Sequence, residues 1–200
     1  MNSFGIINPR ICVSGCIPAT NLQTLKYHKI GLIVNCTKHV DFMLDKQCER
    51  TEDRNFSTYN LNKKIDDQPC YFDSQDGNGS NTFLIRRVRL PVEDNLHLDP
   101  CPTWNLKRTV SELLFMAKCL PRIVQLIYDY INENEDKNVL IHCVAGQQRS
   151  ACVATAYLMK YHKMSLVEAI EFMRKQKKDA FQTGVNFTPS LIDFYENHLM

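Results

Sequence analysis

The spacing of apolar residues divides the chain into alternating strand and helix candidates. Residues 30–34 and 139–141 are short, nearly continuous apolar runs, as expected of parallel strands that are covered on both faces. Residues 8–16 alternate enough to form an opening strand, and residues 83–92 form another whose arginines indicate an edge or a solvent-facing side. This order predicts an α/β domain with a central, mostly parallel sheet and helices on both faces.

Between and after these runs the apolar residues take helical spacing. The pattern predicts helices over residues 18–27, 109–119, 121–134, 151–159, 165–178 and 190–198. Pro121 is expected to break or restart the helix that precedes it, because proline lacks a backbone N–H. Ser165 and Glu168 have the spacing of a capping box, which marks the start of a helix. Pro189 is expected within or just before the last helix.

Residues 46–81 differ in character from the rest of the chain. Mixed charges come first, and residues 74–81 are polar and rich in turn-forming types. So little apolar surface is present that this stretch cannot form a core of its own. We therefore expect one domain over residues 1–200, with a surface insertion at about 46–81.

Composition and charge exclude several classes of protein. The formal net charge of +2 gives no reason to expect nucleic acid or a membrane surface as a partner. No apolar run approaches the ~20 residues that span a bilayer. The first residues lack the pattern of a secretory signal, so a cytoplasmic protein is expected. No particular oligomeric state is predicted.

The nine cysteines are scattered along the chain, without the clustering of a disulfide framework. Three of them lie in apolar surroundings and are expected in the core: Cys36, Cys119 and Cys152. Four residues of metal-binding type were weighed as a zinc site, but their spacing does not support one: Cys48, Cys70, His97 and Cys101. Neither a metal nor another cofactor is expected.

A loop that begins with Cys143 and ends with Arg149 joins the apolar run 139–141 to the helical pattern 151–159. Backbone N–H groups converge in such a loop and at a helix N-terminus, so they favour a bound anion. The same field lowers the pKa of a cysteine thiol from about 8.5 into the range of roughly 3.5–7.5. The loop therefore predicts a sulfur nucleophile beneath a bound phosphate.

Three loop residues suit this chemistry by type. Arg149 offers a planar fork of donors to two phosphate oxygens. Gly146 allows the backbone to approach the ligand at low conformational cost. Ser150 is placed to donate its hydroxyl to the sulfur, and it also suits a plain helix cap.

The segment His142-Cys143-x5-Arg149-Ser150 resembles the signature of the cysteine-dependent protein phosphatases, and its Val-Ala-Gly interior resembles the dual-specificity branch. Residues 11–15, 32–37 and 90–94 resemble, in order, segments that precede the loop in that family. The compact forms carried by large DNA viruses look most similar. The resemblance implies a protein-tyrosine-phosphatase-like fold and phosphorylated proteins as substrates. Phosphotyrosine and phosphoserine or phosphothreonine would be hydrolysed through a cysteinyl-phosphate intermediate.

The resemblance also implies a general acid on another loop. Asp94 follows the strand candidate at the place where related phosphatases have a carboxylate, and Glu93 and Asp99 are its alternatives. His142 either steadies the loop through hydrogen bonds or is a core histidine. The catalytic set is then Cys143, Arg149, Asp94 and Ser150. The residues expected around the phosphate are Val144, Ala145, Gly146, Gln147, Gln148 and Arg149.

Two other functions use a similar loop. RNA 5′-phosphatases of the superfamily often have a histidine within it, and inositol-lipid phosphatases often have lysines. Gln147 and Gln148 are neutral instead, which favours a phosphoprotein substrate. A phosphate-binding module with weak catalysis typically lacks the cysteine, the arginine or the serine, all of which are present here. The spacing disfavours a rhodanese-like sulfur transferase.

Overall fold

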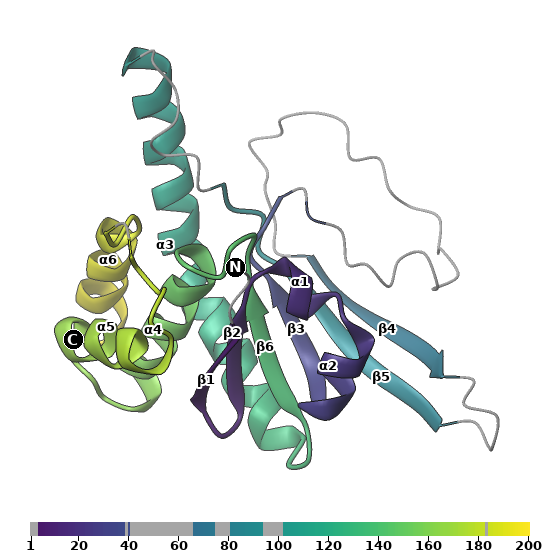
Figure 1. Cartoon of the computed structure of the whole chain (residues 1–200). Helices are drawn as coiled ribbons and strands as arrows, with labels where there is room; N and C mark the ends of the chain where they lie inside the picture. The colour runs from purple at the N-terminus through teal and green to yellow at the C-terminus, as the bar shows by residue number, and fades with distance from the viewer. Residues whose placement is uncertain (1–3, 39, 41–65, 75–80, 94–101, 183) are drawn as a thin grey trace.

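Six strands of the described chain form one sheet (Figure 1). The computed structural model describes residues 4–38, 40, 66–74, 81–93, 102–182 and 184–200. The strands lie in the order β1-β2-β6-β3-β5-β4. Their bounds are β1 Phe4–Asn8, β2 Ile11–Ser14, β3 Ile30–Asn35, β4 Asp66–Ser74, β5 Asn81–Arg89 and β6 Asn138–His142.

The four inner strands β2, β6, β3 and β5 are parallel, whereas β1 and β4 pair antiparallel at the two edges. The prediction of a mostly parallel α/β sheet is therefore confirmed. In β6, Val139 and Ile141 face one core cluster, and Leu140 between them faces another. Because successive strand residues point to opposite faces, the short apolar runs are buried on both sides.

Helices cover both faces of the sheet, as predicted (Figure 1). Residues of α3 to α6 share the larger core cluster, and residues of α1 and α2 share the smaller one. Their bounds are α1 Cys16–Ala19, α2 Leu22–Tyr27, α3 Pro102–Glu133, α4 Arg149–Tyr161, α5 Leu166–Gln176 and α6 Thr188–His198.

Two helix predictions were wrong. Residues 18–27 belong to two short helices, because Asn21 has an extended backbone and its side chain caps α2 by accepting from the Thr24 N–H at 2.9 Å. The break at Pro121 is absent: α3 continues through it. Leu120 and Ile123 are fully buried on either side of the proline, and this packing stabilises a helix that has lost one backbone hydrogen bond.

Two other helix starts agree with the sequence. Ser165 and Glu168 form the capping box: the Ser165 N–H donates to Glu168 Oε2 at 2.8 Å, and the Glu168 N–H donates to Ser165 Oγ at 3.3 Å. Pro189 lies in the first turn of α6, where its missing N–H costs little.

Part of the predicted insertion is a strand of the main sheet. Residues 66–74 form β4, which pairs with β5 along its whole length. Residues 46–65 and 75–80 lie outside the described residues. The single-domain interpretation with a surface insertion remains a prediction.

Candidate active site

The loop from Cys143 to Gln148 leaves the sheet at the carboxyl end of β6, where both neighbouring strands hold it. The Cys36 N–H after β3 donates to the His142 carbonyl at 2.7 Å. The Cys143 N–H donates to the Ser14 carbonyl at 3.4 Å, and the Cys16 N–H donates to the Val144 carbonyl at 3.0 Å. The start of the loop is therefore fixed by backbone atoms on both sides.

Gly146 makes the tight course of this loop possible. Its φ of +78° is in the left-handed region, which glycine adopts readily. A Cβ at this position would lie 2.5 Å from the Ser14 carbonyl carbon and 2.6 Å from the Gly15 nitrogen. A side chain would thus push the loop away from β2. In the native position the Gly146 N–H points at the Cys143 sulfur, with a nitrogen–sulfur distance of 3.2 Å.

The Cys143 sulfur lies where hydrogen bonds and a cation favour its ionised form. Ser150 Oγ donates to Sγ at 3.3 Å, in addition to the Gly146 N–H. Burial alone would raise the pKa of the thiol. The charge of Arg149 and the hydrogen bonds from Ser150 and Gly146 outweigh burial, so the pKa of Cys143 lies below its ordinary value.

Two other buried cysteines show the opposite effect. Burial raises the pKa of Cys12 to about 12. Burial, together with nearby Cys143, raises the pKa of Cys36 well above its ordinary value. Both thiols are therefore protonated at neutral pH, and Cys143 differs from them because of its loop. Cys36, Cys119 and Cys152 are buried, as predicted.

Arg149, the first residue of α4, contacts the segment that follows β5. Its guanidinium Nη1 donates to the Val92 carbonyl at 3.0 Å, and the side chain is buried. The Glu93 N–H donates to Glu112 Oε2 on α3 at 3.0 Å, and the Glu93 carboxylate pairs with Lys38 Nζ at 3.2 Å. The chain leading toward position 94 is thus held beside the loop. Asp94 and Asp99 lie outside the described residues.

This geometry agrees with the comparisons to known proteins. The family model described as dual specificity phosphatase, catalytic domain, matches residues 78–197. The chain belongs to this family. It is 44% identical over 115 residues to a viral tyrosine phosphatase homologue, the 123R protein of Invertebrate iridescent virus 6, covering 58% of this chain and 78% of that protein.

One human relative and one solved human structure extend the comparison. The chain is 40% identical over 82 residues to human dual specificity protein phosphatase 16, which is 40% of this chain and 12% of that protein. The chain thus spans a small part of the length of this longer relative. The crystal structure of human DUSP28 superposes with a TM-score of 0.60 at 16% identity, covering 98% of this chain and 95% of DUSP28. This structural likeness shows the fold.

Within this dual specificity phosphatase domain, the residues predicted around the phosphate differ in exposure. Val144 is 45% exposed, Ala145 and Gln147 are partly buried, and Gly146 and Gln148 are buried. The Gln148 amide contacts the backbone of Gly184 and Asn186. Neither this contact nor that of Glu112 with Glu93 was predicted, because each joins residues far apart in the sequence without a local motif.

His142 is buried beside the loop. Burial lowers the pKa of its imidazole to about 4, against a smaller opposing effect of the Cys143 backbone. Its Nδ1 lies 3.3 Å from the Cys143 carbonyl oxygen. At neutral pH the ring is therefore uncharged. The two roles predicted for His142, core residue and loop support, are compatible with this position.

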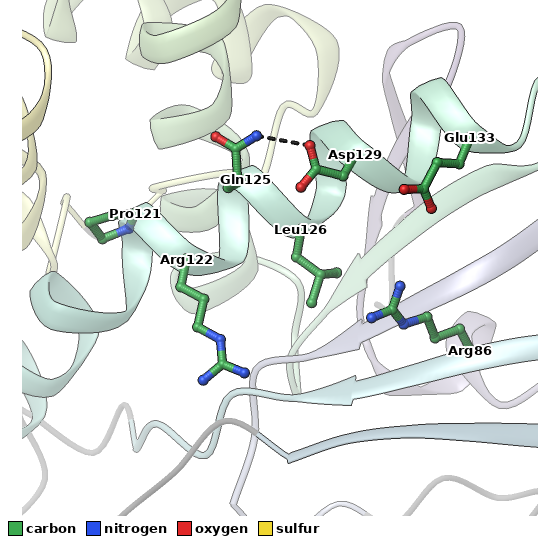
Figure 2. Close-up of a pocket in the computed structure, with 7 residues that line it drawn as sticks. All are labelled: Arg86, Pro121, Arg122, Gln125, Leu126, Asp129 and Glu133. Carbon is green, nitrogen blue, oxygen red and sulfur yellow. Dashed lines mark hydrogen bonds between the residues drawn. The ribbon is translucent and has the colours of Figure 1, made fainter.

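A cavity of about 590 Å³ lies elsewhere, between α3 and β5 (Figure 2). Arg86 comes from β5 and the other lining residues from α3, and none belongs to the loop that carries Cys143. Figure 2 shows the hydrogen bond from Gln125 Nε2 to Asp129 Oδ1, which is 2.8 Å long. The lining carries both signs of charge and contains no nucleophile: Arg86, Pro121, Arg122, Gln125, Leu126, Asp129 and Glu133.

Among the described residues, no three His, Cys, Asp or Glu side chains gather in a way that could hold a metal ion. Cys48, His97 and Cys101 of the weighed zinc site lie outside these residues, and so does the side chain of Cys70. No helix of the described chain combines the length and the apolar character that crossing a bilayer requires.

Proposed function

We propose that the chain is a cysteine-dependent protein phosphatase that hydrolyses phosphotyrosine and phosphoserine or phosphothreonine. The observation that carries the proposal is the environment of the Cys143 sulfur. The Gly146 N–H and Ser150 hydroxyl donate to it, and Arg149 lowers its pKa together with them. A stable thiolate next to a guanidinium is what nucleophilic attack on a phosphate monoester requires.

In the first step, the Cys143 thiolate attacks phosphorus in line. The sulfur–phosphorus bond forms as the ester phosphorus–oxygen bond breaks, and Asp94 donates a proton to the leaving oxygen. The guanidinium of Arg149 and the N–H groups of residues 144–149 stabilise the charge on the other phosphate oxygens. The product is a cysteinyl-phosphate and a dephosphorylated side chain.

In the second step, water attacks the cysteinyl-phosphate and loses a proton to the Asp94 carboxylate. The sulfur–phosphorus bond breaks, inorganic phosphate leaves, and the Ser150 hydroxyl stabilises the departing thiolate. The assignment of Asp94 is supported by its neighbours. The Val92 carbonyl contacts Arg149, and Asp94 follows only two residues later, whereas Asp99 follows seven residues later.

The test is phosphate release from paired phosphotyrosine and phosphothreonine peptides by the purified protein. We expect release from both, none from the Cys143→Ser variant, and a loss of about 10²–10⁴-fold in kcat for Asp94→Asn, the range typical of a general acid. Asp99→Asn is the matched control and should retain the activity. An unchanged rate in Asp94→Asn would reject its assignment.

Triphosphate-ended RNA is the second substrate in the same assay, and the neutral Gln147 and Gln148 predict little release from it. Faster release from RNA than from either peptide would contradict the protein phosphatase proposal. So would peptide binding without any turnover, which would indicate a phosphate-binding module.

A further inference from the structure

Gln148 is the last residue before α4, and its buried side chain contacts a distant segment. Its Nε2 donates to the Gly184 carbonyl at 2.7 Å, and its Oε1 accepts from the Asn186 N–H at 3.2 Å. Both ends of the amide therefore bond to the connection between α5 and α6. Glutamine is suited to this arrangement because its amide is both a donor and an acceptor.

The α5–α6 connection is itself anchored in the core. Phe181 and Phe187 are fully buried members of the larger core cluster. The Phe181 N–H donates to the Gln147 carbonyl at 3.0 Å, which adds a third hydrogen bond between this connection and the loop. The loop is thus hydrogen-bonded to a segment that has two side chains in the core.

We propose that Gln148 is a positioning residue, which holds the Cys143 loop and the first turn of α4 against the α5–α6 connection. The two donors to the Cys143 sulfur, Gly146 and Ser150, lie on either side of Gln148 in the sequence. Fixing position 148 therefore fixes both donors relative to the sulfur. The inference rests on the proposed function, because positioning matters only if Cys143 is the nucleophile.

The first experiment compares Gln148→Met and Gln148→Glu with Gln176→Glu, a control at an exposed position in the last turn of α5. Methionine has a similar length but loses both hydrogen bonds, whereas ionised glutamate keeps only the acceptor. The measurements are kcat and KM for p-nitrophenyl phosphate, and the pH dependence of Cys143 alkylation by iodoacetamide. Peptide mass spectrometry identifies the Cys143 adduct among those of the other cysteines.

We expect both Gln148 variants to lose about 10-fold or more in kcat with a smaller change in KM, because a small displacement of reacting groups is costly. The alkylation midpoint should move to higher pH, most in Gln148→Glu, where a carboxylate also opposes the thiolate. Gln176→Glu should change neither quantity. If the Gln148 variants match this control, the inference is overturned.

The second experiment changes the other partner of the hydrogen bond. Gly184 has a φ of +103°, and a Cβ there would meet nothing within 4 Å. Gly184→Ala therefore acts through the backbone, by disfavouring the conformation that aims its carbonyl at Gln148. We expect it to reproduce the loss of Gln148→Met, and the double variant to lose no more than the worse single variant.

Additive losses in the double variant would overturn the inference. Thermal unfolding of each variant separates loss of folded protein from loss of activity per folded molecule. A wild-type protein without a low alkylation midpoint and without phosphate release would refute the proposed function itself. If the wild-type protein shows a low alkylation midpoint and phosphate release, but the Gln148 variants behave like Gln176→Glu, only the role of Gln148 is refuted.

Discussion

The lowered pKa of Cys143 depends on a few atoms around one sulfur. Burial opposes ionisation of this thiol, as it does at Cys12 and Cys36. The charge of Arg149 lowers the pKa of both Cys143 and Cys36, but only Cys143 also accepts hydrogen bonds from Ser150 and Gly146. A cysteine is thus made a candidate nucleophile by the donors that surround it, and burial by itself has the opposite effect.

Removal of the Ser150 hydroxyl tests this account at a single residue. In Ser150→Ala the sulfur loses the donor at 3.3 Å, so the pKa of Cys143 should rise toward its ordinary value. The alkylation midpoint of Cys143 should move to higher pH, and breakdown of the cysteinyl-phosphate should slow because the departing thiolate is less stable. Stopped-flow kinetics with p-nitrophenyl phosphate should then show a more pronounced burst.

Ser165→Ala is the matched control for this prediction, since it also removes a serine hydroxyl at a helix N-terminus. Its hydroxyl accepts from the Glu168 N–H and donates to the Glu168 carboxylate, at the start of α5. The alkylation midpoint should be unchanged in this variant. An equal midpoint shift in both variants would contradict the role assigned to Ser150.

At the scale of elements, a strand, a tight loop and a helix together form the proposed phosphate site. β6 ends at His142 and α4 begins at Arg149, so the loop between them leads directly into a helix N-terminus, a place that favours negative charge. The arrangement depends on Gly146, whose conformation and close approach to Ser14 exclude a side chain. The Arg149 charge, the Ser150 hydroxyl and backbone N–H groups thus act together on the Cys143 sulfur.

The capping box of α5 gives a second prediction, about stability. Ser165→Ala removes one side-chain cap of α5 and should lower the free energy of unfolding by about 1 kcal/mol. Urea denaturation of the wild-type protein and the variant measures the difference, with kcat recorded as an internal control. Because α5 carries no loop donor, kcat should stay at the wild-type value. If the Ser165→Ala variant had the same midpoint of denaturation as the wild-type protein, the cap would contribute nothing to stability.

At the scale of the whole molecule, local patterns predicted the parts of the fold that depend on local sequence. The apolar runs of β3 and β6 and the strand–loop–helix around Cys143 are continuous in sequence, so their periodicity was informative. The continuous α3 was missed because packing around Pro121 overrides the local preference. The hydrogen bonds of Glu112 to Glu93 and of Gln148 to Gly184 were missed because tertiary folding creates them.

Burial of His142 beneath the loop predicts a loss of global stability in acid. The pKa of its imidazole is about 4 in the folded protein and about 6.5 in an unfolded chain. Between these two pH values the unfolded state binds more protons than the folded state. The stability that the uncharged imidazole contributes is therefore complete above about pH 6.5. It is lost as the pH falls toward 4, and the difference between the two pKa values corresponds to about 3 kcal/mol.

Urea denaturation at pH 7 and at pH 4.5 measures this effect when the wild-type protein is compared with His142→Asn, which cannot titrate at this position. The wild-type protein should lose more stability between the two pH values than the variant does, because only its buried imidazole must take up a proton.

An NMR titration of the wild-type protein needs no variant: the His142 ring signals should not move between pH 7.5 and pH 5.5. Two results would contradict this prediction: movement of the His142 signals near pH 6.5, or equal acid sensitivity of the two proteins. Either result would mean that the buried imidazole takes up a proton in the folded state without cost. The effect of burial assigned to His142 would then be wrong.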